Sequence, residues 1–292
     1  MTADSKPTWP ALAADHPLLQ LHSRLPTILE QAEHSHIWGV HLSPATPPDF
    51  GTLLILQKYL RSVADDVDKA AENLTKTLKW RKEFGLDNEN ANTPPEDFGP
   101  DFIGLGYVTK VGKHGGGENV VTWNVYGAVQ DIKKPFGDHQ RFLRWRIGLM
   151  ERAITHLHLS TTSTPIPDYG KGDDPHRIDQ VHLYGGVSFL RMDPLIKAAS
   201  KATIEIMQAH YPELLLRKFF VEVPLIMSWM FSAVSLFVSA ETAKKFQVIS
   251  YKQNLGRELG LGRLEDIPQD LGGTGPDLPT LEKRLEHEIP PQ

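Results

Sequence analysis

The stretch Gln180–Arg191, QVHLYGGVSFLR, decides the fold class of this 292-residue chain. Its aliphatic residues favour a β-strand, and its two consecutive glycines indicate a bend or bulge. Successive side chains of a strand point to opposite faces of the sheet. His182 and Tyr184 are therefore predicted on one face, and Val181 and Leu183 on the other.

Strands and helices alternate around this segment. Strands are predicted at 107–110, 119–130, 178–191 and 218–223, and helices at 137–158, 194–210 and 225–245. This alternation indicates an α/β sheet with helical crossovers. The glycine-rich segment 112–119 lies between two strands, so it is interpreted as a hairpin tip rather than a phosphate cradle.

The residues that precede the predicted sheet show the periodicity of helices rather than that of strands. Residues 51–84 contain two helical patterns on either side of an acidic turn at Asp65-Asp66. The loop that follows is rich in Pro, Asn and Asp, which indicates a domain boundary. We therefore predict an N-terminal helical cap over residues 1–85, a main domain over 100–275 and a C-terminal tail over 276–292.

Composition excludes several classes of function. The formal charge is −5, so no basic excess indicates nucleic-acid binding. The absence of cysteine excludes disulfides, thiolate metal sites and a Cys nucleophile, and it fits an intracellular protein. Glu222 and Pro224 interrupt the apolar stretch 219–238, well short of the about 20 apolar residues that a membrane span needs. The N-terminus also lacks the features of a signal peptide.

An arginine occupies the apolar side of the helix predicted at 137–158. With about 100° of rotation per residue, Arg146 falls at the centre of the apolar face. The charged residues predicted on the opposite, solvated face are Arg141, Arg144, Glu151 and Arg152. A buried guanidinium needs an anion or several acceptors. Arg146 is therefore predicted to pair either with a core carboxylate or strand carbonyls, or with the phosphate or carboxylate of a ligand.

A third polar aromatic residue, Tyr126, ends the apolar run VVTWNVY of the strand predicted at 119–130. Tyrosine, histidine and a buried arginine that converge in an apolar α/β domain favour a pocket for a large, mostly apolar and partly anionic ligand. The alternative is a hydrogen-bonded structural pair of His182 and Tyr184. His156 and His158 point about 160° apart on a helix, which disfavours a metal pair there.

Two longer motifs resemble the CRAL-TRIO, or yeast secretory phosphatidylinositol-transfer, family. The first is LQKYLRSVADDVDKAAENLTKTLKWRKEF, and the second is YPELLLRKFFVEVPLIMSWMFSAVSLFVSAETAKKF. The resemblance covers about residues 50–260. It implies a CRAL-TRIO lipid-binding fold with an N-terminal helical cap, a mixed β-sheet flanked by helices and an apolar gate helix over Pro224–Lys245. Glu222 is a departure, because many members have Asn two positions before the proline.

Two further runs, RFLRWRIGLMERAI and QVHLYGGVSFLRMD, resemble a fungal, haem-binding and non-classical branch of this family. The resemblance implies ferric haem b with the Tyr184 oxygen as axial iron ligand and His182 beside it. It also implies haem contacts from Tyr126, Arg146 and Lys218. Tyrosinate is a hard anionic ligand of ferric iron, and cationic side chains suit the haem propionates.

These resemblances imply a carrier rather than an enzyme: a non-classical phosphatidylinositol transfer protein that also binds haem b. The implied partners are phosphatidylinositol, haem and a membrane surface, which the protein would contact peripherally. The implied location is the cytoplasm, with peripheral association to the endoplasmic reticulum or other internal membranes, and the implied role is in phosphoinositide homeostasis or oxidant stress. Two alternatives stay open: a haem enzyme of the catalase or peroxidase type, and a sensor or adaptor that reports its ligand.

Overall fold

The structure is a computed structural model that describes residues 7–86, 98–112, 117–187, 193–223, 240–259 and 263–287. The chain divides into two compact units. We call the first the helical unit; it comprises Met1–Asn92, Ile154–His176 and Ile206–Leu214. We call the second the sheet unit; it comprises Thr93–Ala153, Arg177–Glu205 and Leu215–Gln292.

The helical unit is built from short helices and one small hairpin. Its elements are α1 (Pro17–Ser23), α2 (Leu25–Ala32), β1 (His36–Ile37), β2 (Val40–His41), α3 (Phe50–Ser62) and α4 (Val67–Phe84). The side chains of Asp49 and Asp66 accept hydrogen bonds from the backbone N–H groups of Thr52 and Lys69, and these N-caps begin α3 and α4. Gly85, in the left-handed conformation, ends α4. The two helices predicted over 51–84 are confirmed.

Two buried cations of α3 hold the polar insertion 160–175 within the helical unit. Lys58 Nζ lies 2.7 Å from Asp174 Oδ2, and both side chains are fully buried. Arg61 donates to the backbone carbonyl of Pro167 at 2.6 Å. The basic residues of the LQKYLRS motif are therefore structural, since each satisfies backbone or carboxylate acceptors that would otherwise be buried without partners.

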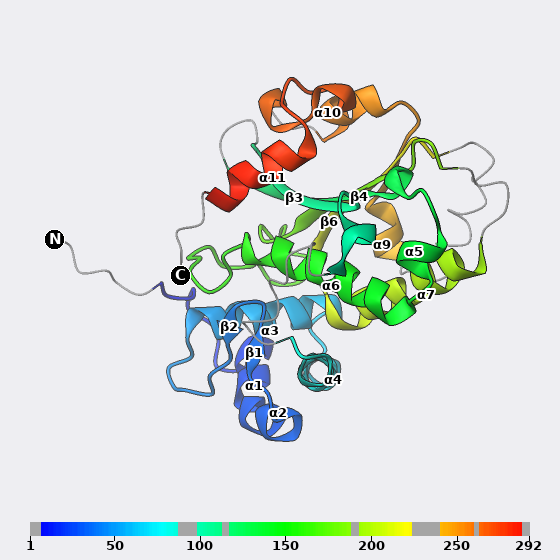
Figure 1. The fold of residues 1–292 in the computed structure, drawn as a ribbon. Helices are drawn as coiled ribbons and strands as arrows, with labels where there is room; N and C mark the ends of the chain where they lie inside the picture. Colours follow the sequence, from blue (N-terminus) through cyan, green and yellow to red (C-terminus); the bar gives the residue numbers. More distant parts are fainter. Residues whose placement is uncertain are drawn as a thin grey trace. The chain divides into compact units, whose positions relative to one another are not determined.

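The sheet unit contains a five-stranded mixed sheet (Figure 1). Its strands, in spatial order, are β3 (Gly106–Gly112), β4 (Glu118–Val125), β5 (Ile178–Leu183), β6 (Leu215–Val221) and β7 (Phe246–Ile249). β3 and β4 pair antiparallel as a hairpin, and the other neighbours pair in parallel. The predicted mixed sheet and the hairpin around residues 112–119 are confirmed.

The two faces of this sheet differ in character. One face packs into an apolar core that includes Trp123, Val181 and Phe219 and residues of α10 (Leu255–Glu258) and α11 (Leu278–His287). Figure 1 shows these two helices on one side of the sheet, with α6 (His139–Thr155) on the other. The opposite face, here called the polar face, carries two cross-strand rows. They are Thr122, Gln180 and Lys218, followed by Asn124, His182 and Phe220.

Several predicted boundaries are wrong for identifiable reasons. β4 ends at Val125 and is followed by a 3-10 turn, η3 (Tyr126–Ala128), and β5 ends at Leu183 before the Gly-Gly turn. Periodicity alone does not reveal where a strand stops pairing. The segment predicted as a C-terminal tail contains α11, whose leucines join the buried core.

The helix predicted at 225–245 falls mostly outside the described residues, which include only 240–245 of that range, where Ala240–Lys244 forms the short helix α9. The proposed gate helix is therefore left as a prediction. Within the described ranges, no helix combines the length and apolar character that crossing a bilayer requires.

Candidate ligand-binding site

The structure brings together the three aromatic residues singled out from the sequence. Tyr126 follows β4 and Tyr184 follows β5, so both lie at the carboxyl ends of neighbouring strands. Ring centroids are 5.6 Å apart for Tyr126 and His182, and 5.4 Å apart for Tyr126 and Tyr184. The rings of His182 and Tyr184 are 6.5 Å apart and nearly parallel, at 17°. Carboxyl ends of parallel strands are the usual position of ligand sites in α/β sheets.

Two phenylalanines extend this aromatic cluster across the polar face. Phe220 of β6 lies 5.6 Å from the His182 ring, and Phe246 of β7 lies 5.4 Å from Phe220. Neither phenylalanine is predicted as a site residue from the sequence. Their alternation was visible within each strand, but the parallel register that places Phe220 opposite His182 was not.

Arg146 of α6 is 1% exposed, as its helical phase predicted. Arg144 is exposed, in agreement with the same phase. Glu151 was placed on the solvated face, and this is wrong, because it is only 2% exposed. The helix is thus covered over a wider arc than its apolar stripe indicates.

The Arg146 side chain hydrogen-bonds the side chain of Tyr126. Burial raises the pKa of Tyr126, and the nearby guanidinium partly offsets that rise. The pair links helix α6 to the end of β4.

Lys218 provides a second cation at the site. Its Nζ lies 5.5 Å from the Phe220 ring centroid and 5.8 Å from that of Phe246, within the range of cation–π contacts. Lys218 forms no salt bridge with any described residue. Burial, and then the charge of Arg146, lower the pKa of Lys218 to about 7. A bound anion would relieve this repulsion and restore the charge of the lysine.

The same surroundings determine the protonation states of His182 and Tyr184. Burial, and then the charges of Lys218 and Arg146, hold the pKa of His182 well below its ordinary value, so the imidazole is neutral. Burial, and then Tyr126, raise the pKa of Tyr184 well above its usual range. The phenol therefore keeps its proton at neutral pH unless a bound cation stabilises the phenolate.

The described residues contain no group of three or more His, Cys, Asp or Glu side chains arranged to hold a metal ion. Tyr184 could provide one oxygen ligand, and the neutral ring of His182 lies nearly parallel to the Tyr184 ring, with the centroids 6.5 Å apart.

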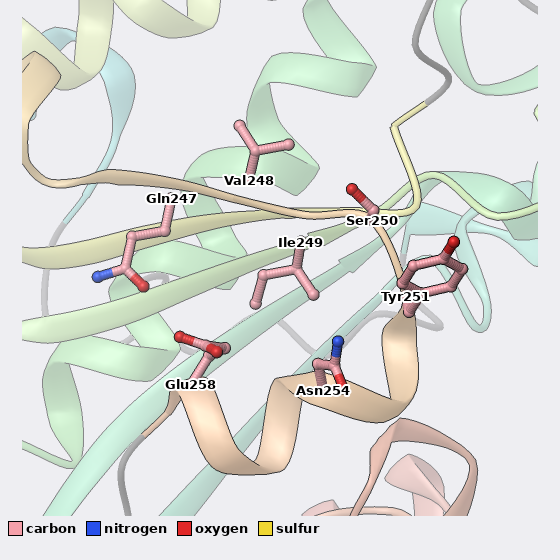
Figure 2. A pocket seen from close by; sticks show the side chains of 7 residues that line it. All are labelled: Gln247, Val248, Ile249, Ser250, Tyr251, Asn254 and Glu258. Atoms are coloured by element: carbon pink, nitrogen blue, oxygen red, sulfur yellow. The ribbon is translucent and has the colours of Figure 1, made fainter.

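A separate pocket of about 510 Å³ lies along β7 and α10. Figure 2 shows its lining side chains: Gln247, Val248, Ile249, Ser250, Tyr251, Asn254 and Glu258. None of the five predicted site residues belongs to it. Tyr251 at its rim is 71% exposed. The pocket and the aromatic cluster are therefore different features of the sheet unit.

Comparison with known proteins identifies the family. Residues 116–273 match the family model described as the CRAL/TRIO domain. The chain belongs to the CRAL/TRIO family. The predicted family and fold are thus confirmed, and the matched range contains Tyr126, Arg146, His182, Tyr184 and Lys218.

This CRAL/TRIO protein has similar relatives among fungi. It is 66% identical over 284 residues to the phosphatidylinositol transfer protein SFH5 of Cryptococcus neoformans, covering 97% of this chain and 95% of the relative. It is 47% identical over 286 residues to the protein of the same name from Phaeosphaeria nodorum, covering 97% and 83%. A crystal structure of Sfh5 superposes with a TM-score of 0.74 at 28% identity, over 93% of both chains. The relatives are named as transfer proteins, in agreement with the expectation of a carrier.

Proposed function

We propose that the chain is a phosphatidylinositol transfer protein that also binds haem b at the aromatic cluster of its polar face. The observation that carries the proposal is Lys218, a cation that forms no salt bridge within the described part of the chain, near the buried Arg146 and among aromatic rings. Such a site favours a ligand with an anionic group and a large apolar body. A phosphoinositide has a phosphate and acyl chains, and haem has two propionates and a porphyrin. The names of the relatives support the first ligand.

The residues present fit haem as well. Tyr126, Phe220 and Phe246 offer flat apolar contacts, and Arg146 and Lys218 offer cations for two carboxylates. Bound there, ferric haem b would supply an iron centre that accepts an anionic oxygen ligand. Tyr184 would hold that centre through its phenolate oxygen, in the manner of catalase.

His182 has a supporting part in this proposal. Because its pKa lies well below the ordinary value, it adds no positive charge beside the Tyr184 oxygen. A neutral imidazole can accept or donate a hydrogen bond, and groups around a ligand atom set its basicity. We propose that His182 tunes the Tyr184 phenolate.

We also propose a cytoplasmic protein that associates peripherally with the endoplasmic reticulum or other internal membranes, since a lipid carrier must meet a membrane to exchange its cargo. A place in phosphoinositide homeostasis or in the response to oxidants would follow from the two ligands. Cell fractionation tests the location: release from membranes by high salt supports it, and release by detergent alone contradicts it.

Two assays test the ligands separately. Labelled phosphatidylinositol transfer between vesicles should exceed a protein-free control, and no excess for demonstrably folded protein rejects lipid transfer. The purified protein supplied with haem should show a ferric tyrosinate absorption and electron paramagnetic resonance spectrum, and its absence rejects haem binding. Peroxide turnover no faster than that of free haem would separate a carrier from a haem enzyme.

A further inference from the structure

Four polar side chains lie close together on β4 and β5, next to the aromatic cluster. Thr122 pairs with Gln180 across the two strands, and Asn124 pairs with His182. Their exposed fractions are 0% for Thr122 and Asn124, 6% for Gln180 and 4% for His182. Buried polar side chains almost always have hydrogen-bond partners, so the partners of these four side chains have to be identified.

Three atoms of this group have no hydrogen-bond partner within the described part of the chain: Thr122 Oγ1, Asn124 Oδ1 and His182 Nε2. The orientation of the Asn124 amide is fixed, because its Nδ2 donates to the Val181 carbonyl at 3.2 Å. The oxygen is therefore the acceptor of this side chain that has no partner among the described residues. Gln180 already has a partner, since its Nε2 donates to Met150 Sδ at 3.8 Å.

The chemistry of these three atoms defines what could satisfy them. Asn124 Oδ1 only accepts hydrogen bonds, whereas Thr122 Oγ1 can donate and accept. His182 Nε2 does one or the other, depending on the tautomer. An ionised carboxylate or phosphodiester has no proton to donate to the amide oxygen, and the charges of Arg146 and Lys218 disfavour a cation. A neutral hydroxylic molecule matches all three atoms.

We propose that Thr122, Asn124 and His182 hold an ordered water molecule beside the aromatic cluster, and that this water fixes the tautomer and orientation of His182. Buried waters typically make about three hydrogen bonds to polar groups that lack other partners, which is the number available here. Thr122 and Asn124 are then positioning residues that act on His182 through the water. Because the proposal concerns the ligand-free protein, its test does not depend on whether the protein transfers lipid or binds haem.

The test compares two Thr→Val substitutions, which remove a hydroxyl and keep the shape of the side chain. The readout is the 15N resonance of His182 Nε2 in ligand-free protein, assigned by its loss in His182→Gln. Thr122→Val should shift this resonance and lower the unfolding midpoint. Thr109→Val is the matched control, because the buried Thr109 hydroxyl accepts from Trp123 Nε1 at 2.9 Å. It should lower the midpoint without moving the His182 signal.

The proposal would be overturned if Thr122→Val leaves the Nε2 resonance unshifted and has an unfolding midpoint equal to or above that of the wild type. This result would mean that no ordered water is bound by the three side chains. A shift seen only after phosphatidylinositol loading would assign the hydroxyl to the lipid and also overturn it. If Thr122→Val does not fold, a high-resolution crystal structure of the ligand-free wild type decides. A water within hydrogen-bond distance of at least two of the three atoms supports the proposal, and its absence refutes it.

Discussion

Gly127 lies against the backbone of Gly185 so closely that a Cβ atom at position 127 would come within 2.0 Å of the Gly185 carbonyl oxygen. Each glycine directly follows a tyrosine of the site, Tyr126 on one strand end and Tyr184 on the other. The two turns thus approach each other as closely as their backbones permit. The same two turns carry the two tyrosine rings, whose centroids are 5.4 Å apart.

The first prediction concerns this contact. Gly127→Ala should push the two turns apart, because the obstacle is a backbone carbonyl that cannot rotate away. We expect a loss of about 1–3 kcal/mol in the free energy of unfolding, as for other overpacked positions, and weakened haem retention. Gly185→Ala is the control: its Cβ would meet the carboxylate end of Glu222, which can move. Urea unfolding of both variants measures the difference, and equal losses would contradict the argument.

The second prediction uses the two neighbouring arginines of α6. Arg146→Ala removes a buried cation from the site, so an anionic ligand group would lose its partner. We expect haem to bind about 10- to 100-fold more weakly, which corresponds to roughly 1.4–2.8 kcal/mol. Arg144→Ala, at an exposed position, should leave the affinity within about twofold. Spectrophotometric haem titration compares them, and similar losses for both variants would show that Arg146 does not face the ligand.

The third prediction follows from the pKa of Lys218, which burial and Arg146 lower to about 7 in the folded protein. An unfolded lysine titrates near pH 10.4. Between about pH 7 and pH 10 the unfolded state therefore binds more protons at this residue, so the contribution of Lys218 to stability rises with pH. Lys218→Met should remove this contribution. It should also stabilise the ligand-free protein relative to the wild type at and below neutral pH.

The measurement for Lys218 is the difference in unfolding free energy between wild type and Lys218→Met across this pH range. A difference that does not change with pH would show that the lysine is not destabilised by its surroundings. The affinity for an anionic ligand should change with pH in the opposite direction, because an anion interacts more favourably with the protonated lysine than with the neutral one. The wild type should therefore bind haem or phosphatidylinositol more weakly as the pH rises above about 7, and Lys218→Met should not.

Local periodicity was enough to predict part of this site. Strand alternation placed His182 with Tyr184, and helical phase buried Arg146, because both depend only on residues a few positions apart. The partners across the sheet could not be predicted in this way. Phe220 and Asn124 flank His182 through the register of two parallel pairings, which the sequence of any one strand does not contain.

Glu222, which stands where many family members have asparagine, has an unusual backbone conformation. Its φ is +56°, in the left-handed region, which asparagine tolerates better than glutamate. An Asn at this position, as the family resemblance describes, would suit that backbone. The chain instead keeps Glu222, whose carboxylate lies over Gly185.

The last prediction concerns His182 and Tyr184 themselves. Tyr184→Phe keeps the ring that packs near Tyr126 and Phe220 but deletes the phenolic oxygen, so the fold should survive. The ferric tyrosinate spectrum should disappear, because no oxygen ligand remains for the iron. His182→Ala should retain haem with a shifted phenolate-to-iron absorption, since it removes only the group that tunes the ligand.

The structural-pair interpretation of His182 and Tyr184 makes the opposite forecast. If the phenol serves only the packing and hydrogen bonding of the cluster, Tyr184→Phe would cost about 1 kcal/mol of stability and leave any haem spectrum intact. Visible absorption and electron paramagnetic resonance of both variants, together with urea unfolding, separate the two interpretations. An unchanged high-spin ferric signal in Tyr184→Phe would exclude Tyr184 as the iron ligand, whatever the change in stability.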